Sequence, residues 1–582
     1  MMAGGALALW GRSILDPPRQ SGGTLRDIGA TASEIFGDRT RDAGIDFVHF
    51  NGMCGQHYYY EMMGPGVALF DYDNDGDLDV LLLQGCMLAP GKTWADAWFP
   101  PTGSGPLRAR LYRNDTVIHS NGDRTLKFTD VTEESGLDAR GYGMAVAAGD
   151  FNNDGWVDLY IANYGYSQLW RNNGNGTFTD VTQASGTNVA GWSSSASWVD
   201  FDRDGWLDLF VANYINFRFE DNKKCLGKSG VPDYCGPLSY DPLPNHLFRN
   251  RRDGTFEDVT AKSQIGREFN GALGVVCGDF DEDGWMDIYV ANDGRPKQLW
   301  MNQHDGTFKN MAMLAGCAVN ADGEPQSSMG VDAGDFNNDS HEDLLVANLI
   351  GEYADLYVND GKAMFDDRSF DSGLAKATSP YTIFSIGFLD YDNDGWLDVF
   401  FAGGAVIDLE ARKRAGDRYP LGLPKGLLHN TRDGRFEDAT SGAGQTFSLL
   451  EVSRGVAFGD IDNDGDTDIL LANNNGPTRL LINSVGHKKH WLGLRMIGEK
   501  VNRDMFGTRV AVFRANGPTL WRRVHTDGAY ASSNDPRVLF GLGDSPEVSK
   551  VRAYWLSGRV EEWTGLAADK YTTLREGSGT TL

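Results

Sequence analysis

The nine residues DYDNDGWLD at positions 390–398 decide the fold, because close copies of them occur seven times along the chain. A short apolar stretch precedes each copy, and a run of strand-forming residues such as LDLFVANY follows it. Repetition of this kind indicates a repeat architecture, and we read each copy as the loop between the first two strands of one repeat. The copies begin at Asp71, Asp150, Asp200, Asp279, Asp335, Asp390 and Asp460.

A second shared unit lies downstream of each loop, for example LWRNNGNGTFTDVT from residue 169 and LFRNRRDGTFEDVT from residue 247. Its Asn and Gly residues indicate a tight hairpin between two further strands. Seven repeats of four antiparallel strands, without a long helical pattern, predict an all-β, seven-bladed β-propeller. The last repeat lacks its fourth strand, and residues 35–40 match the missing form. We therefore expect this N-terminal strand to complete the seventh blade.

The aspartate loops stop near residue 488, where alternating strands such as WLGLRMIG and GTRVAVFRA begin. We predict three segments: an N-terminal tail or export-signal remnant at 1–34, the propeller at 35–487, and a small β domain at 488–582. A stretch of this length and pattern is typical of a compact sandwich or small barrel.

Composition narrows the class of protein. The formal net charge of −28 argues against nucleic acid as a partner, and the 41% hydrophobic content is that of a globular chain. No window of 18 uncharged apolar residues exists, so we expect no transmembrane segment. The apolar N-terminal stretch MMAGGALALW lacks a preceding basic region, which leaves an atypical export signal or a simple tail as alternatives.

The aspartates point to a metal. Carboxylates at positions 1, 3, 5 and 9 of each loop, with the carbonyl of position 7, place oxygen ligands around one point, as Ca²⁺ requires, and Gly at position 6 permits the turn. Up to seven Ca²⁺ are expected; Mg²⁺ fits less well, and an acidic turn without an ion is the alternative. The candidate ligands are Asp71, Asp73, Asp75, Asp77, Asp79, Asp150, Asn152, Asp154, Trp156, Asp158, Asp200, Asp202, Asp204, Trp206, Asp208, Asp279, Asp281, Asp283, Trp285, Asp287, Asp335, Asn337, Asp339, His341, Asp343, Asp390, Asp392, Asp394, Trp396, Asp398, Asp460, Asp462, Asp464, Asp466 and Asp468.

The seven loops are not equivalent. In the fifth, Ser340 replaces the glycine and Asn337 replaces a carboxylate, so we expect this site to bind most weakly. The first and seventh carry an extra carboxylate, Asp77 and Asp466, and should bind most tightly.

A second candidate region lies on the opposite face of the ring. The connection between the second and third strands is long in repeats one, three and six, and loops on a rigid scaffold commonly carry binding sites. The segment entering repeat one, His57-Tyr58-Tyr59-Tyr60-Glu61, maps to the same face. His57, Tyr58 and Glu61 are candidate catalytic residues, with His57 or Glu61 as general acid or base. The alternatives are a packed aromatic loop, and long loops that only cover the channel mouth or hold the C-terminal domain.

The cysteines suggest two pairings. Cys54 with Cys86, and Cys225 with Cys235, are plausible disulfides in an exported protein. We expect His487, in the linker between the two domains, to be solvated.

Two motif sets resemble known families. The loops, preceded by forms such as Phe458-Gly459-Asp460, resemble the FG-GAP/VCBS repeats of integrin-like propellers. The C-terminal stretches 507–510 (GTRV), 527–538 (DGAYASSNDPRV), 540–543 (FGLG) and 555–558 (WLSG) resemble the ASPIC/UnbV domain. The pairing is similar to the cartilage acidic protein-like family, and the resemblance implies an exported calcium-binding protein.

Two functions therefore remain. The first is a binding or adhesion module, secreted, periplasmic or at the cell surface, that presents the long-loop face to a glycan, protein or small molecule. The second is an enzyme with its site near residues 57–61. We favour the first, because no known catalytic motif is found and the metal loops are rich enough in protein oxygens to leave no open coordination position.

Overall fold

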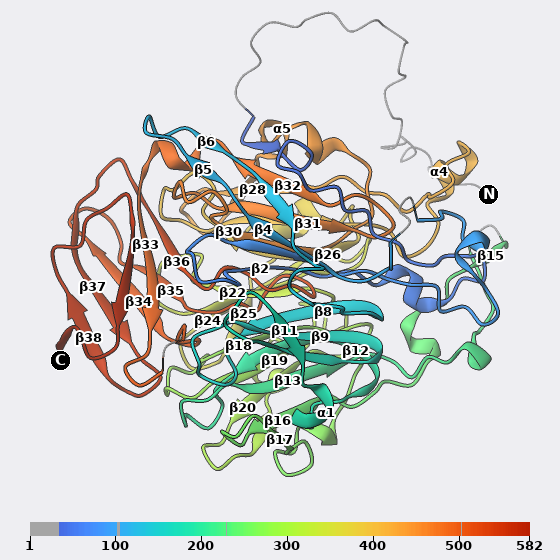
Figure 1. The fold of residues 1–582 in the computed structure, drawn as a ribbon, viewed down its shortest axis with the longest axis horizontal. Helices are drawn as coiled ribbons and strands as arrows, with labels where there is room; N and C mark the ends of the chain where they lie inside the picture. Colours follow the sequence, from blue (N-terminus) through green and yellow to red (C-terminus); the bar gives the residue numbers. More distant parts are fainter. Residues whose placement is uncertain (1–33, 102–104, 228–229, 502) are drawn as a thin grey trace, which may run out of the picture.

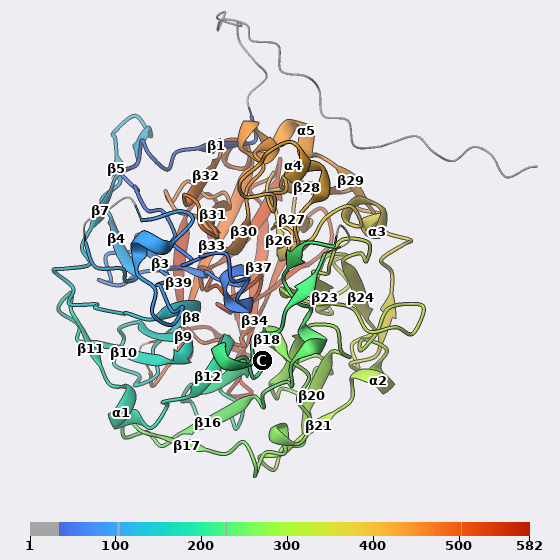
Figure 2. The same cartoon turned by 90° about the vertical axis from the view of Figure 1, so that its right-hand side faces the viewer.

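The computed structural model describes residues 34–101, 105–227, 230–501 and 503–582, so nearly all of the predicted tail at 1–34 lies outside the described residues. The described residues form seven four-stranded antiparallel units, which follow one another around a ring (Figure 2), and two further sheets near the C-terminus. The predicted all-β fold is confirmed. Blades two and three are additionally joined, because β9 pairs with both β8 and β12.

Blades one to six each contain four strands in chain order, and blade seven contains three that are joined by an N-terminal strand described below. Blade one contains β2 (Val67–Phe70), β3 (Asp79–Leu82), β4 (Arg110–Asn114) and β7 (Phe128–Asp130); blade two β8 (Tyr142–Gly149), β9 (Asp158–Tyr166), β10 (Gln168–Asn172) and β11 (Phe178–Asp180); blade three β12 (Ala190–Val199), β13 (Asp208–Asn213), β16 (His246–Asn250) and β17 (Phe256–Asp258). Blade four contains β18 (Ala272–Gly278), β19 (Asp287–Asn292), β20 (Gln298–Asn302) and β21 (Phe308–Asn310); blade five β22 (Val331–Gly334), β23 (Asp343–Val346), β24 (Asp355–Asn359) and β25 (Phe365–Asp367). Blade six contains β26 (Ile383–Leu389), β27 (Asp398–Gly403), β28 (Gly426–Asn430) and β29 (Phe436–Asp438); blade seven β30 (Ser453–Gly459), β31 (Asp468–Asn473) and β32 (Arg479–Asn483).

Short elements occupy the connections between these strands. They include the hairpins β5 (Val117–Ile118) with β6 (Arg124–Thr125) and β14 (Cys225–Leu226) with β15 (Pro232–Asp233), and the helices α1 (Thr182–Ser185), α2 (Ala312–Ala315), α3 (Leu374–Thr378), α4 (Glu410–Arg414) and α5 (Thr440–Ala443).

The N-terminal strand β1 (Phe36–Asp38) closes the ring. It pairs antiparallel with β32, with Phe36 opposite Asn483 and Asp38 opposite Leu481. The Phe36 ring is buried and stacks on Phe447, 5.8 Å away. The predicted completion of blade seven by this strand is confirmed, so the first and last described parts of the propeller are held together by a sheet ladder.

Seven asparagines join neighbouring blades. Each ends the third strand of its blade, and its side-chain amide donates to two carbonyls: that of position 8 in its own aspartate loop and that of position 2 in the loop of the preceding blade. In blade six, for example, Asn430 Nδ2 lies 2.9 Å from both Leu397 O and Phe336 O. The seven residues are Asn114, Asn172, Asn250, Asn302, Asn359, Asn430 and Asn483, and all are buried. The aspartate loops therefore form a hydrogen-bonded ring.

The C-terminal domain is a sandwich of two sheets. One contains β36 (Val538–Gly543), β33 (His490–Ile497) and β39 (Tyr571–Arg575); the other contains β35 (Leu520–Arg523), β34 (Arg509–Arg514), β37 (Val548–Tyr554), β38 (Val560–Trp563) and β40 (Thr580–Thr581). Apolar side chains of both sheets share one core. Of the two predicted alternatives, the structure contains the sandwich. Figure 1 shows this domain (red) against one face of the ring, opposite β15 and α4.

A segment of the C-terminal domain, residues 526–536, enters the centre of the ring. Ala531 O accepts a hydrogen bond from Val146 N at 3.2 Å, and Ala529 O accepts one from Val331 N at 2.9 Å. The buried Tyr530 hydroxyl donates to Met63 O, in the segment that enters blade one, at 3.0 Å. The innermost strands are rich in small residues here: a Cβ added at Gly455 would lie 2.7 Å from Ser532 Oγ. This central segment therefore fills the channel of the propeller.

Candidate metal centres and the opposite face

The carboxylate at position 1 organises every aspartate loop. In loop six, Asp390 Oδ1 accepts a hydrogen bond from Asp394 N at 3.0 Å, and Asp390 Oδ2 accepts one from Gly395 N at 2.8 Å. The same two bonds occur in the other six loops. Position 6 has a left-handed φ throughout, +94° at Gly395 and +83° at Ser340. Glycine adopts this conformation without strain, whereas Ser340 in loop five does so at a cost.

The carboxylate at position 9 attaches the loop to its sheet. In loop six, Asp398 Oδ1 accepts from Asn430 N at 2.7 Å and Oδ2 accepts from Tyr391 N at 3.2 Å. All seven position-9 aspartates are buried. The last aspartate of the motif is therefore a structural residue, whether or not it also binds a metal.

Position 3 carries a carboxylate oxygen that lacks a hydrogen-bond partner. In every loop with aspartate there, Oδ1 is buried and accepts no hydrogen bond from the described part of the chain. These residues are Asp73, Asp202, Asp281, Asp392 and Asp462. A buried carboxylate oxygen without a donor is costly unless a proton or a cation neutralises it. Asp462 Oδ1 has an ion-pair contact with Arg124 Nε at 3.8 Å, and the repetition of the atom in the other four loops fits a cation.

The remaining carboxylates converge on the same points. Ligand oxygens of Asp71, Asp73 and Asp79 lie within 4.8 Å of one another, and the third and fourth loops contain similar triads. Burial, with repulsion from neighbouring aspartates, raises the pKa of Asp71 to about 6 and that of Asp279 to about 7. The fold thus gathers carboxylates where their ionised form is unfavourable without a counter-ion. This is the property of a cation site.

Loops two and five differ at position 3. The amide of Asn152 donates to Asp154 Oδ2 at 2.9 Å, and that of Asn337 donates to Asp339 Oδ2 at 2.8 Å. In loops three and six the same position-5 oxygen accepts from an arginine of the hairpin instead, Arg252 or Arg432. Loops two and five are therefore the two sites with less negative charge.

Histidines contact several of the loops, including His304 at Asp283 of loop four. His429 Nδ1 lies 3.1 Å from Asp398 Oδ1, and His487 Nδ1 lies 2.9 Å from Asp466 Oδ2. Hydrogen bonds to Asp464 and Asp466 raise the pKa of His487 to about 10. The side chain of His487 is 37% exposed, as expected for a solvated residue, but it also contacts the last aspartate loop, which the sequence did not predict. In the sequence, His487 lies shortly after the third strand of the last blade. In other blades, a residue of the hairpin that follows this strand contacts the aspartate loop.

The face opposite the aspartate loops is covered by the three long insertions. The rings of Tyr58 and Phe219 are 5.1 Å apart, and the backbone N–H of Asp408 in insertion six donates to Asp233 Oδ2 at 3.3 Å. The C-terminal domain lies on the other face, so the alternative in which the long loops hold this domain does not apply. The insertions instead cover the channel mouth.

The three candidate catalytic residues lie together here, but in unlike environments. Burial raises the pKa of Glu61, in η1 (Tyr59–Met62), to about 8, and its Oε2 accepts from Tyr234 OH at 2.9 Å. Glu61 has no exposed surface. His57 is half-buried, with its ring 5.1 Å from that of Tyr234, and Tyr58 stacks on Tyr60. As placed, the Glu61 carboxyl cannot reach a bound substrate, which favours the packed aromatic loop over catalysis.

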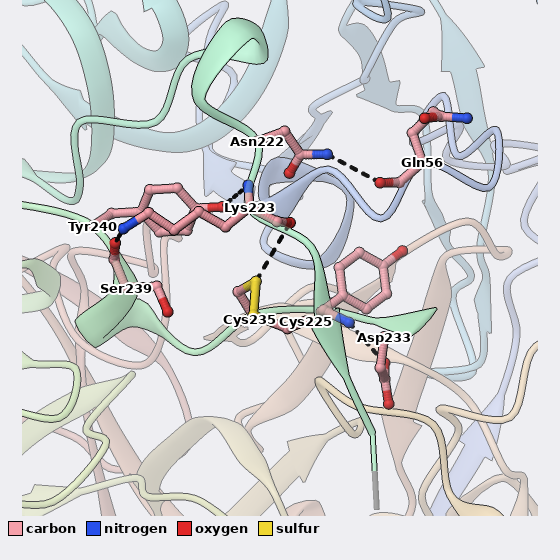
Figure 3. Close-up of a disulfide and its surroundings, with 9 residues drawn as sticks. Gln56, Asn222, Lys223, Cys225, Asp233, Cys235, Ser239 and Tyr240 are labelled. Atoms are coloured by element: carbon pink, nitrogen blue, oxygen red, sulfur yellow. Dashed lines mark hydrogen bonds between the residues drawn. A yellow bond between two sulfur atoms is a disulfide. The ribbon is translucent and has the colours of Figure 1, made fainter. Parts of the chain in front are cut away.

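A disulfide cross-links the insertion of blade three. Figure 3 shows the Cys225–Cys235 bond, which links β14 to the residue that follows Tyr234. Beside it, Asn222 Nδ2 donates to Gln56 O at 3.1 Å and ties the insertion to the segment that enters blade one. The Cys225–Cys235 prediction is confirmed. The other predicted pair is not formed, since Cys54 and Cys86 are free thiols in the described structure.

Comparison with protein families agrees with this architecture. A model described as an FG-GAP-like repeat matches residues 107–161, 150–211, 230–290, 279–346 and 335–401, and one described as ASPIC and UnbV matches residues 498–581. The chain is thus a propeller of FG-GAP repeats joined to an ASPIC/UnbV domain. It is homologous to cartilage acidic protein 1.

The human cartilage acidic protein 1 is 26% identical over 336 residues, which are 56% of this chain and 46% of that protein. The Xenopus tropicalis protein is 27% identical over 301 residues, 50% of this chain and 43% of that protein. The chain spans about half the length of the curated relatives it matches. Among the described residues, no helix combines the length and apolarity needed to cross a membrane.

Solved structures with similar strand arrangements include an Agrocybe aegerita lectin that recognises non-reducing terminal N-acetylglucosamine, with 17% identity and a TM-score of 0.34 over 60% of this chain and 85% of that one. Saccharomyces cerevisiae Sqt1 shows 10% identity and a TM-score of 0.34 over 72% of this chain and 95% of that one. At these scores the likeness carries no functional argument.

Proposed function

We propose that this protein is an exported calcium-binding propeller that acts as a binding or adhesion module. The observation that carries the calcium assignment is the unpartnered Oδ1 of the position-3 aspartate in four loops. Oxygens of positions 1, 3, 5 and 9 and the carbonyl of position 7 would hold the ion. A hard cation with six to eight oxygen ligands would neutralise carboxylates that the fold otherwise buries together.

The affinities are expected to follow the charge of each loop. Loops one and seven, with Asp77 and Asp466, should bind most tightly, and loop five most weakly. The amide contacts of Asn152 place loop two near the weak end as well. Each aspartate that is replaced by an amide removes one charge from the coordination sphere, which lowers affinity for Ca²⁺.

The proposal includes an extracellular or periplasmic location. Millimolar calcium is found outside the cytosol, and the Cys225–Cys235 disulfide is of the kind that persists in oxidising compartments. The face with the three insertions is the proposed binding surface for a glycan, protein or small molecule. Large apolar side chains remain exposed on its insertions, with Trp98 at 45% and Leu238 at 64% exposure.

Calcium titration of the full chain tests the proposal. We expect several Ca²⁺ per chain by elemental analysis after desalting, and a lower melting temperature in EGTA. Asp392→Ala should remove about one equivalent, because it deletes a ligand of loop six. Asp366→Ala is the matched control, since this carboxylate is exposed on β25. An EGTA-independent melting temperature together with no bound metal would contradict the proposal.

A further inference from the structure

Three arginines of the C-terminal domain contact the aspartate loops in one repeated way. Arg503 Nε donates to Asn153 Oδ1 at 2.7 Å, and its Nη2 donates to Gly205 O at 3.1 Å. Asn153 is position 4 of loop two and Gly205 is position 6 of loop three. One guanidinium therefore bridges the position-4 side chain of one loop and the position-6 carbonyl of the next.

The same bridge occurs twice more around the ring. Arg509 Nη2 donates to Glu282 Oε1 at 3.0 Å and to Ser340 O at 2.6 Å, which are position 4 of loop four and position 6 of loop five. Arg537 Nη1 lies 2.7 Å from Asn463 Oδ1 and 3.5 Å from Gly76 O, position 4 of loop seven and position 6 of loop one. Arg503 uses two nitrogens of its guanidinium for the bridge, whereas Arg509 and Arg537 each make both contacts through one terminal nitrogen.

The three arginines are largely buried, so the loss of their contacts would affect stability. Arg503 is 2% exposed, and the side chains of Arg509 and Arg537 are 15% and 10% exposed. A buried guanidinium that loses its acceptors is strongly destabilising. Docking of the C-terminal domain through these residues therefore requires that positions 4 and 6 of the loops stay in their observed conformation.

Positions 4 and 6 of each loop alternate along the chain with the proposed metal ligands. Positions 3, 5 and 7 would bind the ion, so an ion that fixes them also fixes the peptide units of positions 4 and 6 between them. The bridging hydrogen bonds of Arg503, Arg509 and Arg537 go to side-chain and carbonyl oxygens outside the proposed ligand set. Metal and guanidinium thus occupy different atoms of one loop and do not compete.

We propose that the arginine bridges couple metal binding to domain docking: the C-terminal domain recognises the metal-loaded conformation of the loops, and its docking in turn raises their affinity for Ca²⁺. This inference rests on the proposed calcium binding. The coupling is reciprocal by thermodynamic necessity, so a change in one process appears equally in the other. The central segment 526–536 contacts the inner strands instead of the loops and supplies the part of docking that does not depend on metal.

The test uses the full chain with Arg503→Gln and, as matched control, Arg559→Gln. Arg559 belongs to the same domain, and its Nη2 donates to Glu499 Oε2 of that domain at 3.0 Å. Calcium titration calorimetry should show binding at the sites of loops two and three weakened roughly tenfold in Arg503→Gln, within the range usual for coupled sites, and unchanged in Arg559→Gln. Hydrogen exchange of β34 and β35 in the unmodified protein should slow when Ca²⁺ is added.

The outcomes are separable. Calcium binding by the unmodified chain with the same affinity in Arg503→Gln overturns the coupling and leaves the calcium proposal intact. Exchange in β34 and β35 that does not respond to Ca²⁺ also overturns it, and this measurement needs no variant to fold. Absence of calcium binding by the unmodified chain refutes both proposals.

Discussion

The asparagine ring makes a quantitative prediction about how the blades hold together. In blade two, Asn172 Nδ2 donates to Tyr72 O of blade one at 2.8 Å and to Val157 O at 3.3 Å, while its Oδ1 accepts from Gly174 N at 3.0 Å. Asn172 has no exposed surface. Replacing it with alanine removes these three bonds and leaves the Tyr72 carbonyl buried without a donor.

The size of the effect follows from burial. A buried carbonyl that loses its donor costs about 1–3 kcal/mol, and each further lost bond about 0.5–1.5 kcal/mol where water can partly replace it. Val157 and Gly174 are half-buried, so the smaller figure applies to them. We expect Asn172→Ala to destabilise the contact between blades one and two by about 2–4 kcal/mol.

The neighbouring residue provides the control. Asn173 is exposed, and its side chain bonds to the exposed Arg171 and Thr179 and to Thr177, all within the same blade, so Asn173→Ala should change stability by less than about 0.5 kcal/mol. Hydrogen exchange in β3 and β9, with calcium at saturation, reports the local free energy of opening. Equal opening free energies for the two variants would refute the argument that this asparagine joins the blades.

The remaining predictions concern the opposite face. The folded-state pKa of Glu61, about 8, lies above its ordinary value of 4.5, so the folded state retains the proton; the contribution of Glu61 to stability should be fully present below about pH 4.5 and be lost, by a few kcal/mol, as pH rises to 8. Urea unfolding across this window checks the slope, which Glu61→Gln should flatten; an unchanged slope would contradict the assignment. Cys225→Ser opens a loop closed over 10 residues and should destabilise insertion three by about 2–3 kcal/mol, read as faster proteolysis there, with Cys86→Ser as control. Equal proteolysis of both variants would show that the disulfide carries no local stability.

Local patterns made most of the fold predictable. Seven DxDxDG loops and the strand patterns around them are short-range signals, so the number of blades, the strand order and the closing strand β1 follow from residues close together in the chain. The same holds for the candidate ligands, since five loops place Asp at position 3 and four of them leave its Oδ1 unpartnered. One disulfide of two was foreseen, because spacing alone does not say which thiols face each other.

The sequence by itself determined the repeat, the propeller and the chemistry of each loop, because hydrogen bonds within nine residues and short runs of strand-forming apolar residues set these features. Only the tertiary structure decided which face the C-terminal domain covers, that residues 526–536 fill the channel, and that Arg503, Arg509 and Arg537 bridge neighbouring loops. These contacts join residues more than 150 positions apart or from separate domains. Their partners are chosen by how complete surfaces fit, which no local pattern encodes.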